Sequence, residues 1–288
     1  MALLTGVGVA IITPFSSDFS VDYVNLEKLI DHVINCKVNY IVTLGTTGET
    51  ATLSEEEKLA ILNFTYEKVN GRVPVVVGIG GNNTTQVIKQ LQTWPLEKAT
   101  AILSVSPYYN KPSQEGIYQH YAAIAKSTSK SIILYNVPGR TMSNISAETT
   151  IRLANDFKNI IGTKEASGNM IQCMHLVKNK PEGFLLISGD DHITLPLIAC
   201  GFDGVISVAA NSFAAEFSLL VHLALEGNYE EARKIQSRLL VQMDLLFAEN
   251  NPAGVKAFCA EKGLCQNVLR LPLVPLSEKF MEQVKQFS

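Results

Sequence analysis

The chain has 288 residues, of which 47% are apolar, so it can bury a large core in one or two domains. Its net charge of -3, together with the lack of a long basic run, argues against a surface for nucleic acid or for an anionic membrane. The five cysteines are scattered without C-x-x-C spacing, which favours reduced thiols in the cytoplasm over a disulfide framework or a zinc site.

The first apolar segment, Met1–Ala10, has no basic stretch before it and continues directly into Ile11–Pro14. We therefore interpret it as a first strand and not as a signal peptide. No apolar run approaches the roughly 18–20 residues that span a bilayer.

Short runs rich in β-branched residues then alternate with helical patterns. The predicted strands are Val7–Ile12, Tyr40–Leu44, Val73–Gly78, Ala101–Ser106, Ile132–Tyr135, Ile160–Lys164, Phe184–Ser188 and Gly204–Val208. The predicted helices between them include Asn25–Cys36, Ser54–Val69, Thr84–Gln92, Gln114–Lys126 and Ala147–Ala154. Near-continuous apolar strands are typical of a parallel sheet that is buried on both faces. Eight of them predict an α/β fold, the closed (β/α)8 TIM barrel.

The chain beyond the eighth strand predicts further helices. They are Ala214–Glu226, Tyr229–Ala248 and Pro252–Lys262, with a last helix after the proline-containing segment Leu271–Pro275. No linker or low-complexity stretch separates them from the barrel. We expect a catalytic barrel over residues 1–213 and a C-terminal helical extension of the same domain over residues 214–288.

Reactive side chains follow or end three of the predicted strands. Lys164 ends the sixth strand, Tyr135 ends the fifth, and Thr46 and Thr47 follow the second. The C-terminal strand ends of such barrels form the active site, and neighbouring strands lie about 4.8 Å apart. Tyr135 and Lys164 should therefore be adjacent. Because side chains alternate along a strand, Glu165 is expected to face the helices as a structural partner.

These residue types suggest chemistry on a carbonyl compound that bears a carboxylate. A lysine attacks a ketone only as the neutral amine, and neutralising an ordinary lysine at pH 7 costs about 4.6 kcal/mol. Desolvation at an apolar barrel mouth lowers that cost, and a phenol can move the protons. The glycines of Gly45–Gly48 allow backbone N–H groups to approach a small carboxylate, although an ordinary tight turn is the alternative.

Two other motifs do not indicate a bound cofactor. Gly78–Gly81 lacks the third glycine of a dinucleotide-binding fingerprint, so we predict a turn at the barrel rim. Ser188–His192 contains two aspartates and a histidine, but no second cluster at ligand spacing accompanies it. We predict a strand-to-helix cap there, with no metal.

Five segments resemble the dihydrodipicolinate synthase family of pyruvate-dependent Schiff-base enzymes. They are Gly45–Glu49, Ser106–Gly116, Tyr135–Thr141, Gly162–Gly168 and Leu269–Leu276, and the resemblance runs from the first strand to the last helix. It implies a lyase that condenses pyruvate with L-aspartate 4-semialdehyde to 4-hydroxy-tetrahydrodipicolinate, in lysine and diaminopimelate biosynthesis. It also implies a cytoplasmic homotetramer, built as a dimer of dimers, that needs no cofactor.

The resemblance implies a catalytic role for four residues. Lys164 forms a Schiff base with pyruvate, and the derived enamine attacks the aldehyde. Tyr135 donates and accepts protons. It is linked through Thr46 to Tyr109, which enters from a neighbouring subunit.

Three further residues are implied to bind the substrates. Thr47 and the Ile206 backbone hold pyruvate, and Arg140 binds the semialdehyde carboxylate. The alternatives are N-acetylneuraminate lyase or a 2-keto-3-deoxy-sugar-acid aldolase of the same superfamily, and a non-catalytic keto-acid sensor. The sialic-acid enzymes typically have Ser at the Thr47 position and an apolar residue at the Arg140 position, so this chain favours the synthase.

Many members of the family are inhibited by L-lysine at a dimer-interface pocket, where a glutamate accepts the ligand's ammonium and histidines line the wall. The corresponding positions here are predicted to be Gln86 for the glutamate and Glu55 and Lys58 for the histidines. The other residues of the predicted pocket preserve its general outline, namely Thr50, Ala51, Asn82 and Tyr108. We expect weak sensitivity to lysine, or none, because an amide replaces the carboxylate and Lys58 repels a cation.

Overall fold

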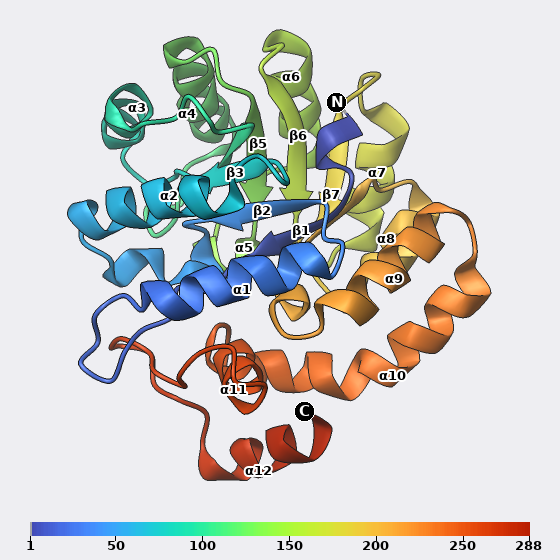
Figure 1. Cartoon of the computed structure of the whole chain (residues 1–288). Coiled ribbons are helices and arrows are strands. Elements are labelled where there is room, and N and C mark those ends of the chain that lie inside the picture. The colour runs from blue at the N-terminus through green and yellow to red at the C-terminus, as the bar shows by residue number, and fades with distance from the viewer. Residues whose placement is uncertain (1) are drawn as a thin grey trace.

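The computed structural model describes residues 2–288, in which eight parallel strands close into a barrel in chain order (Figure 1). The strands are β1 Gly6–Ala10, β2 Tyr40–Thr43, β3 Val75–Gly78, β4 Ala101–Val105, β5 Ile132–Asn136, β6 Ile160–Glu165, β7 Leu185–Ser188 and β8 Gly204–Ser207. Their ends lie within two residues of the predicted ends. The predicted TIM barrel is thus confirmed.

A ring of helices surrounds the barrel, with one helix after each strand. These are α1 Tyr23–Asn35, α2 Glu55–Val69, α3 Thr84–Thr93, α4 Gln114–Ser127, α6 Ala147–Asp156, α7 Met170–Asn179, α8 Thr194–Cys200 and α9 Ala214–Leu225. A capping box starts α2, because Ser54 and Glu57 exchange side chain-to-backbone hydrogen bonds of 2.9 and 3.2 Å. Ser146 caps α6, because its hydroxyl accepts a hydrogen bond from the Thr149 N–H at 3.1 Å.

The barrel interior and the space between barrel and helices hold separate layers of apolar side chains. Inside the barrel, Tyr40, Val76, Ile133 and Ile187 pack from different strands and are fully buried. The outward-facing side chains of the strands pack on the apolar faces of the helices. The interior is therefore a packed core and not a channel, and a ligand has access only at the strand ends.

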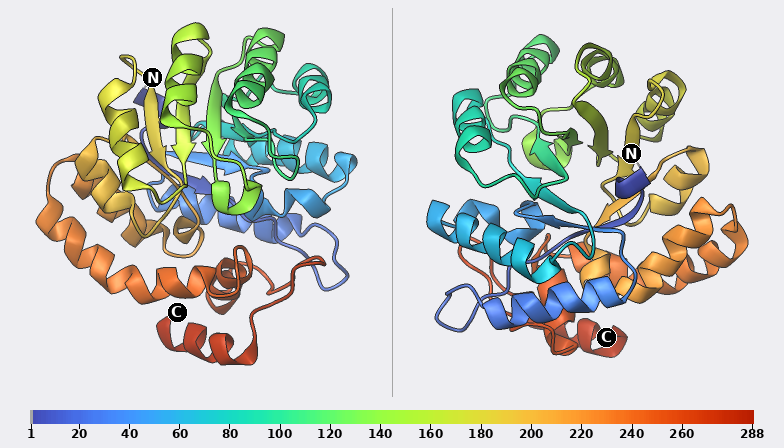
Figure 2. Two further views of the ribbon diagram at one scale, coloured as in Figure 1. Left: turned by 180° about the vertical axis from the view of Figure 1, so that it is seen from behind. Right: turned by 45° about the horizontal axis from the view of Figure 1, so that its top comes forward.

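Helix α9 is the eighth helix of the ring, because it contacts β1 and β8 and lies beside α1 and α8. The boundary expected at residue 213 falls before this helix, so we place the C-terminal extension after it. The extension comprises α10 Tyr229–Phe247, α11 Ala253–Glu261 and α12 Glu278–Phe287. It lies on the side toward which the arrowheads of β5 and β6 point, as the view from behind also shows (Figures 1 and 2).

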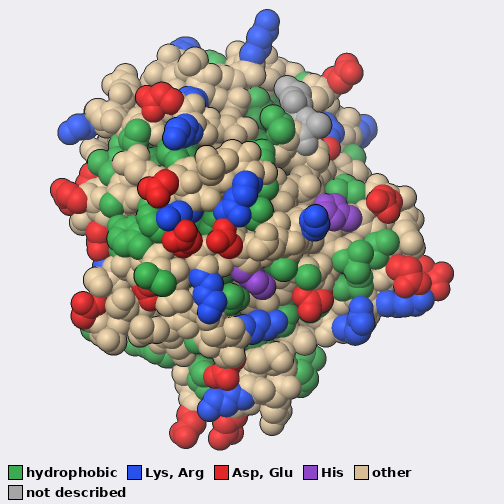
Figure 3. All heavy atoms as spheres, in the orientation of Figure 1, with side chains coloured by type: hydrophobic (Ala, Val, Ile, Leu, Met, Phe, Trp, Pro, Cys, Tyr) green, Lys and Arg blue, Asp and Glu red, His purple; other side chains and the backbone are tan. Residues whose placement is uncertain are grey.

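Acidic and basic side chains are interspersed over the face that Figure 3 presents. The five cysteines are free thiols. Within residues 2–288, no helix combines the length and the apolar character that crossing a membrane requires.

Candidate active site

Lys164 and Tyr135 lie side by side near the C-terminal ends of β6 and β5. The two residues are paired in the parallel register, and the Lys164 amine is 4.3 Å from the centroid of the Tyr135 ring. They are only 5% and 8% exposed. Gly189 makes room for the lysine, because a Cβ at that position would come within 3.0 Å of Lys164 Cε. The adjacency predicted from strand spacing is confirmed.

Thr46 and Thr47 lie in a turn after β2 that forms a 3-10 helix, η2 Thr46–Gly48. The two hydroxyls differ in environment, since Thr46 is exposed and Thr47 is buried. The Thr13 hydroxyl donates to the Gly48 carbonyl at 2.7 Å and ties this turn to the chain after β1. The sequence places the turn correctly, but it does not reveal which threonine is enclosed.

A cavity of about 440 Å³ opens at this end of the barrel. Seven of the predicted site residues line it, namely Thr46, Thr50, Ala51, Lys58, Tyr108, Tyr135 and Arg140. The Gly78–Gly81 turn contributes Gly78 to Gly80, in agreement with its predicted place at the rim. Lys164 is outside the wall but contacts Tyr135, which is part of it. The cavity thus brings a phenol, a hydroxyl and a guanidinium to one space, and the buried Lys164 amine lies beside the Tyr135 ring.

Asn251 belongs to this site, although sequence reasoning did not select it. Its side-chain amide donates to Thr47 Oγ1 at 2.9 Å. Its backbone carbonyl accepts from an Arg140 guanidinium nitrogen at 3.4 Å. It therefore connects two residues that the resemblance assigns to different substrates. The only sequence signal is the Asn250-Asn251-Pro252 run, which resembles an ordinary turn.

Arg140 lies in a short helix, α5 Pro138–Thr141, which follows β5. Pro138 suits the first position of a helix because its missing N–H would have no partner there. The helix is only four residues long, so periodicity cannot reveal it. The Arg140 side chain is exposed and faces the cavity that Tyr135 also lines.

Other polar residues near the strand ends have structural partners. Glu165 accepts hydrogen bonds from Asn136, from the Ser167 N–H and from Gln172, and so faces away from the barrel axis as expected. Asp191 accepts from the N–H groups of residues 208 and 209 and caps the turn after β8. Among residues 2–288, no cluster of three or more His, Cys, Asp or Glu is placed to hold a metal.

The remaining predicted site residues differ in their exposure to solvent. Ile206 is buried in β8 and is paired with Gly8 of β1. Tyr109 is 87% exposed and has a positive φ of 73°. Asn82 donates to the Tyr108 carbonyl at 3.1 Å and so stays near the cavity.

Three members of the predicted regulatory pocket, Glu55, Asn82 and Gln86, do not line the cavity. The Glu55 carboxylate accepts the Trp94 indole N–H at 2.6 Å, so it is directed toward α3. Gln86 is exposed on α3. Of the three replaced positions, only Lys58 faces the cavity.

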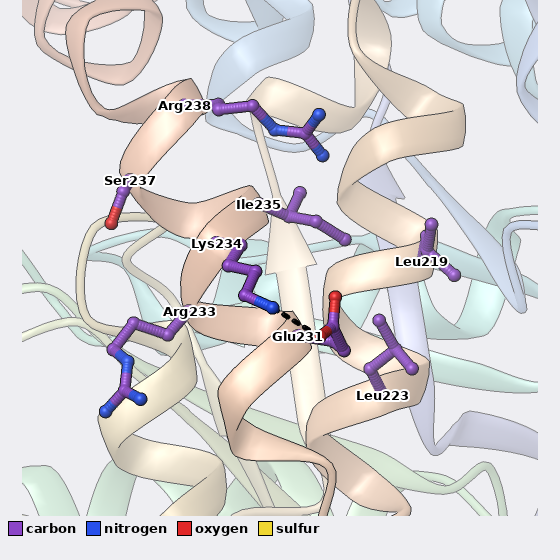
Figure 4. Close-up of a pocket in the computed structure, with 8 residues that line it drawn as sticks. All are labelled: Leu219, Leu223, Glu231, Arg233, Lys234, Ile235, Ser237 and Arg238. Carbon is purple, nitrogen blue, oxygen red and sulfur yellow. Dashed lines mark hydrogen bonds and ion pairs between the residues drawn. The ribbon is translucent and has the colours of Figure 1, made fainter.

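A larger hollow of about 850 Å³ lies on the outer surface between α9 and α10 (Figure 4). Its wall includes Leu219 and Leu223, and Lys234 is already paired with Glu231 at 2.6 Å. It has no counterpart of the buried lysine–tyrosine pair at the barrel mouth. The smaller cavity is therefore the candidate active site.

A buried ion pair lies next to this site. Glu49, at the end of the η2 turn, pairs with Lys256 of α11, and both side chains are fully buried. Burial lowers the pKa of the Lys256 amine, and the Glu49 charge opposes that change. Arg270 adds a second ion pair nearby, with Glu57 of α2. The C-terminal extension thus contacts the turn that carries the two threonines.

A buried lysine beside a tyrosine at the mouth of a (β/α)8 barrel is the arrangement that a Schiff-base-forming enzyme requires. The chain matches the profile of the dihydrodipicolinate synthetase family over residues 3–287, and it belongs to that family.

Two relatives that carry the name 4-hydroxy-tetrahydrodipicolinate synthase are similar over their whole length. The protein from Parabacteroides distasonis is 53% identical, with 99% of this chain and 97% of the relative covered. The protein from Flavobacterium psychrophilum is 49% identical, with coverage of 100% and 98%. Among solved structures, the chloride-inhibited dihydrodipicolinate synthase from Acinetobacter baumannii, complexed with pyruvate, is 39% identical. It superposes with a TM-score of 0.95, and the match covers 99% of this chain and 97% of that one.

Proposed function

We propose that the chain condenses pyruvate with L-aspartate 4-semialdehyde, which is the lyase reaction of a 4-hydroxy-tetrahydrodipicolinate synthase. Membership of the family and relatives of about 50% identity over the whole chain support this activity. The single observation that carries the mechanism is the buried Lys164 amine 4.3 Å from the Tyr135 ring. No carboxylate among residues 2–288 forms an ion pair with that amine, so it has no competing partner.

The proposed sequence of steps begins with attack of Lys164 Nζ on the ketone carbon of pyruvate. The carbinolamine loses water to give an iminium ion, and loss of a methyl proton gives an enamine. The enamine carbon then attacks the semialdehyde carbonyl and forms the new carbon–carbon bond. Finally, the amine of the second substrate displaces Lys164 from the imine carbon and closes the ring. The protonated imine serves as the electron sink, so these steps require no organic cofactor.

The surrounding residues have roles that fit these steps. Tyr135 lies beside the amine, and its hydroxyl is proposed to exchange protons during formation and loss of the carbinolamine. The buried Thr47 hydroxyl accepts a hydrogen bond from Asn251, which leaves its own O–H to donate to the pyruvate carboxylate. Arg140 offers its guanidinium to the carboxylate of the second substrate at the cavity wall.

Borohydride reduction in the presence of pyruvate tests the proposal. Reduction of the imine should fix the three-carbon adduct on the protein, and peptide mapping should locate it on Lys164. The Lys164→Ala variant is the control and should acquire no adduct. An unlabelled Lys164 in the parent protein would reject the Schiff-base mechanism.

We further propose that the active unit contains at least two subunits and that the assembly is a homotetramer. The highly exposed Tyr109 supports this, because a tyrosine in that position can complete the relay of a neighbouring copy but has no enclosed place in its own barrel. The free thiols support a cytoplasmic location.

Mixing two inactive variants tests the shared site. Tyr109→Phe retains Lys164, whereas Lys164→Ala retains Tyr109. Hybrid dimers of the two contain one complete site, so mixing should restore part of the activity. Absence of recovery after subunit exchange has been verified by native mass spectrometry would count against a shared site.

A further inference from the structure

The η2 turn that carries Thr46 and Thr47 has an uncommon backbone conformation at both ends. Leu44 before it and Glu49 after it have φ values of 56° and 52°. Residues other than glycine rarely adopt this left-handed region, and they keep it only where the surrounding structure fixes it. The positions of the two hydroxyls therefore depend on the contacts that hold this turn.

Glu49 makes several of these contacts through its buried carboxylate. Oε1 pairs with the Lys256 ammonium, and Oε2 accepts the Arg270 backbone N–H at 3.1 Å. The Glu49 backbone N–H donates to the Thr46 carbonyl, also at 3.1 Å. Although Glu49 borders the cavity, both carboxylate oxygens are occupied by the protein itself. One residue thus joins the turn to two segments of the C-terminal extension.

Lys256 is fixed in turn by its own surroundings. Its ammonium donates to the Val268 carbonyl at 2.8 Å and lies 4.1 Å from the centroid of the Phe15 ring. The helix that carries Lys256 begins just after Asn251, which donates to Thr47. A buried ammonium with these partners cannot change position freely, and the carboxylate paired with it is held in the same way.

We propose that Glu49 and Lys256 are positioning residues for the reaction, and that their ion pair sets where the Thr46 and Thr47 hydroxyls stand at the barrel mouth. The inference rests on the proposed function, because that function assigns these hydroxyls to the proton relay and to pyruvate. The pair acts through the turn and not by contact with the substrate.

The test removes both charges at once, because a single substitution would leave the other charge buried without a partner. The double variant Glu49→Gln/Lys256→Met keeps the side-chain volumes nearly unchanged. We expect it to fold, and we expect kcat/KM for pyruvate to fall by about ten- to a hundred-fold, since a displacement of about 1 Å can cost that much. The pyruvate concentration that half-saturates borohydride trapping should rise as well, which loss of stability alone would not cause.

The matched control removes an ion pair at the opposite end of the barrel. Lys180 and Asp203 are 3.1 Å apart, and Asp203 immediately precedes β8. The double variant Lys180→Met/Asp203→Asn should keep the parent kcat/KM for pyruvate within about twofold.

A second variant, Glu49→Asp, keeps the charge but shortens the side chain by one methylene. A positioning role predicts a lower kcat/KM for pyruvate at a parent-like melting temperature, because the turn must move to keep the pair. Parent-like kinetics in either folded variant would overturn the proposal. Failure of both variants to fold would also overturn it, since the pair would then belong to the fold alone. The proposed function is judged separately, by the pyruvate adduct on Lys164 of the parent enzyme.

Discussion

Two buried lysines of this protein differ in what surrounds them. Lys256 of α11 is fully buried and pairs with the Glu49 carboxylate. Lys164 is almost as buried, but within residues 2–288 it contacts the Tyr135 ring and forms no ion pair with a carboxylate. Burial alone therefore does not identify a reactive amine. In this comparison, the lysine with a carboxylate partner holds the fold, and the buried lysine without one is available to a substrate.

Replacing each lysine by methionine would test this comparison most strongly. Lys256→Met leaves the Glu49 charge buried without its partner and should lower the free energy of unfolding by about 3–5 kcal/mol. Lys164→Met should change it by less than about 1 kcal/mol, because no ion pair is lost, and should abolish turnover. Urea denaturation and steady-state kinetics measure the two effects. Equal destabilisation by both substitutions would break the distinction between the two lysines.

Arg140 extends the comparison to a cation at the cavity wall. Arg140→Ala removes a charge-assisted contact to a carboxylate, which is worth about 1.5–3 kcal/mol, or about ten- to a hundred-fold in kcat/KM for the semialdehyde. Borohydride trapping of pyruvate should be nearly unchanged. Equal damage to pyruvate trapping would show that Arg140 serves the first substrate.

Lys58 is a further cation of the cavity wall without a carboxylate partner among residues 2–288. Its charge, together with the absence of a carboxylate from the Gln86 position, should make inhibition by L-lysine weak. We expect half-inhibition above about one millimolar, because loss of one charge-assisted bond weakens binding by about ten- to a hundred-fold. The double variant Lys58→His/Gln86→Glu should gain sensitivity. Half-inhibition of the parent below about one millimolar would refute this prediction.

The barrel and the core of the site were predictable because they rest on local patterns. Buried parallel strands are continuous β-branched runs, and register follows once they are placed next to one another. The adjacency of Tyr135 and Lys164 needed only the knowledge that consecutive strands are neighbours.

The parts that were missed depend on contacts between distant segments. Asn251 and Thr47 are 204 positions apart, and no local pattern connects them. Lys256 did leave a signal, because it is a charged residue in the apolar run Gly254–Ala260. The same reasoning that selected Lys164 would have selected it, but the sequence could not show that Glu49 is its partner. Neither α7 nor α8 was named among the predicted helices, and α8 is only seven residues long, too short for a clear helical period.

The contacts of the C-terminal extension also determine when the site can form during synthesis. The turn at residues 46–49 leaves the ribosome early, but its partner Arg270 is separated from Glu49 by 221 positions. At about 5–20 residues per second, translation takes roughly 10–45 seconds to cover that interval. A nascent chain can pair all eight strands and still lack the groups that hold Thr46 and Thr47. Catalytic competence should therefore appear only with the last stretch of the polypeptide, well after the barrel itself can assemble.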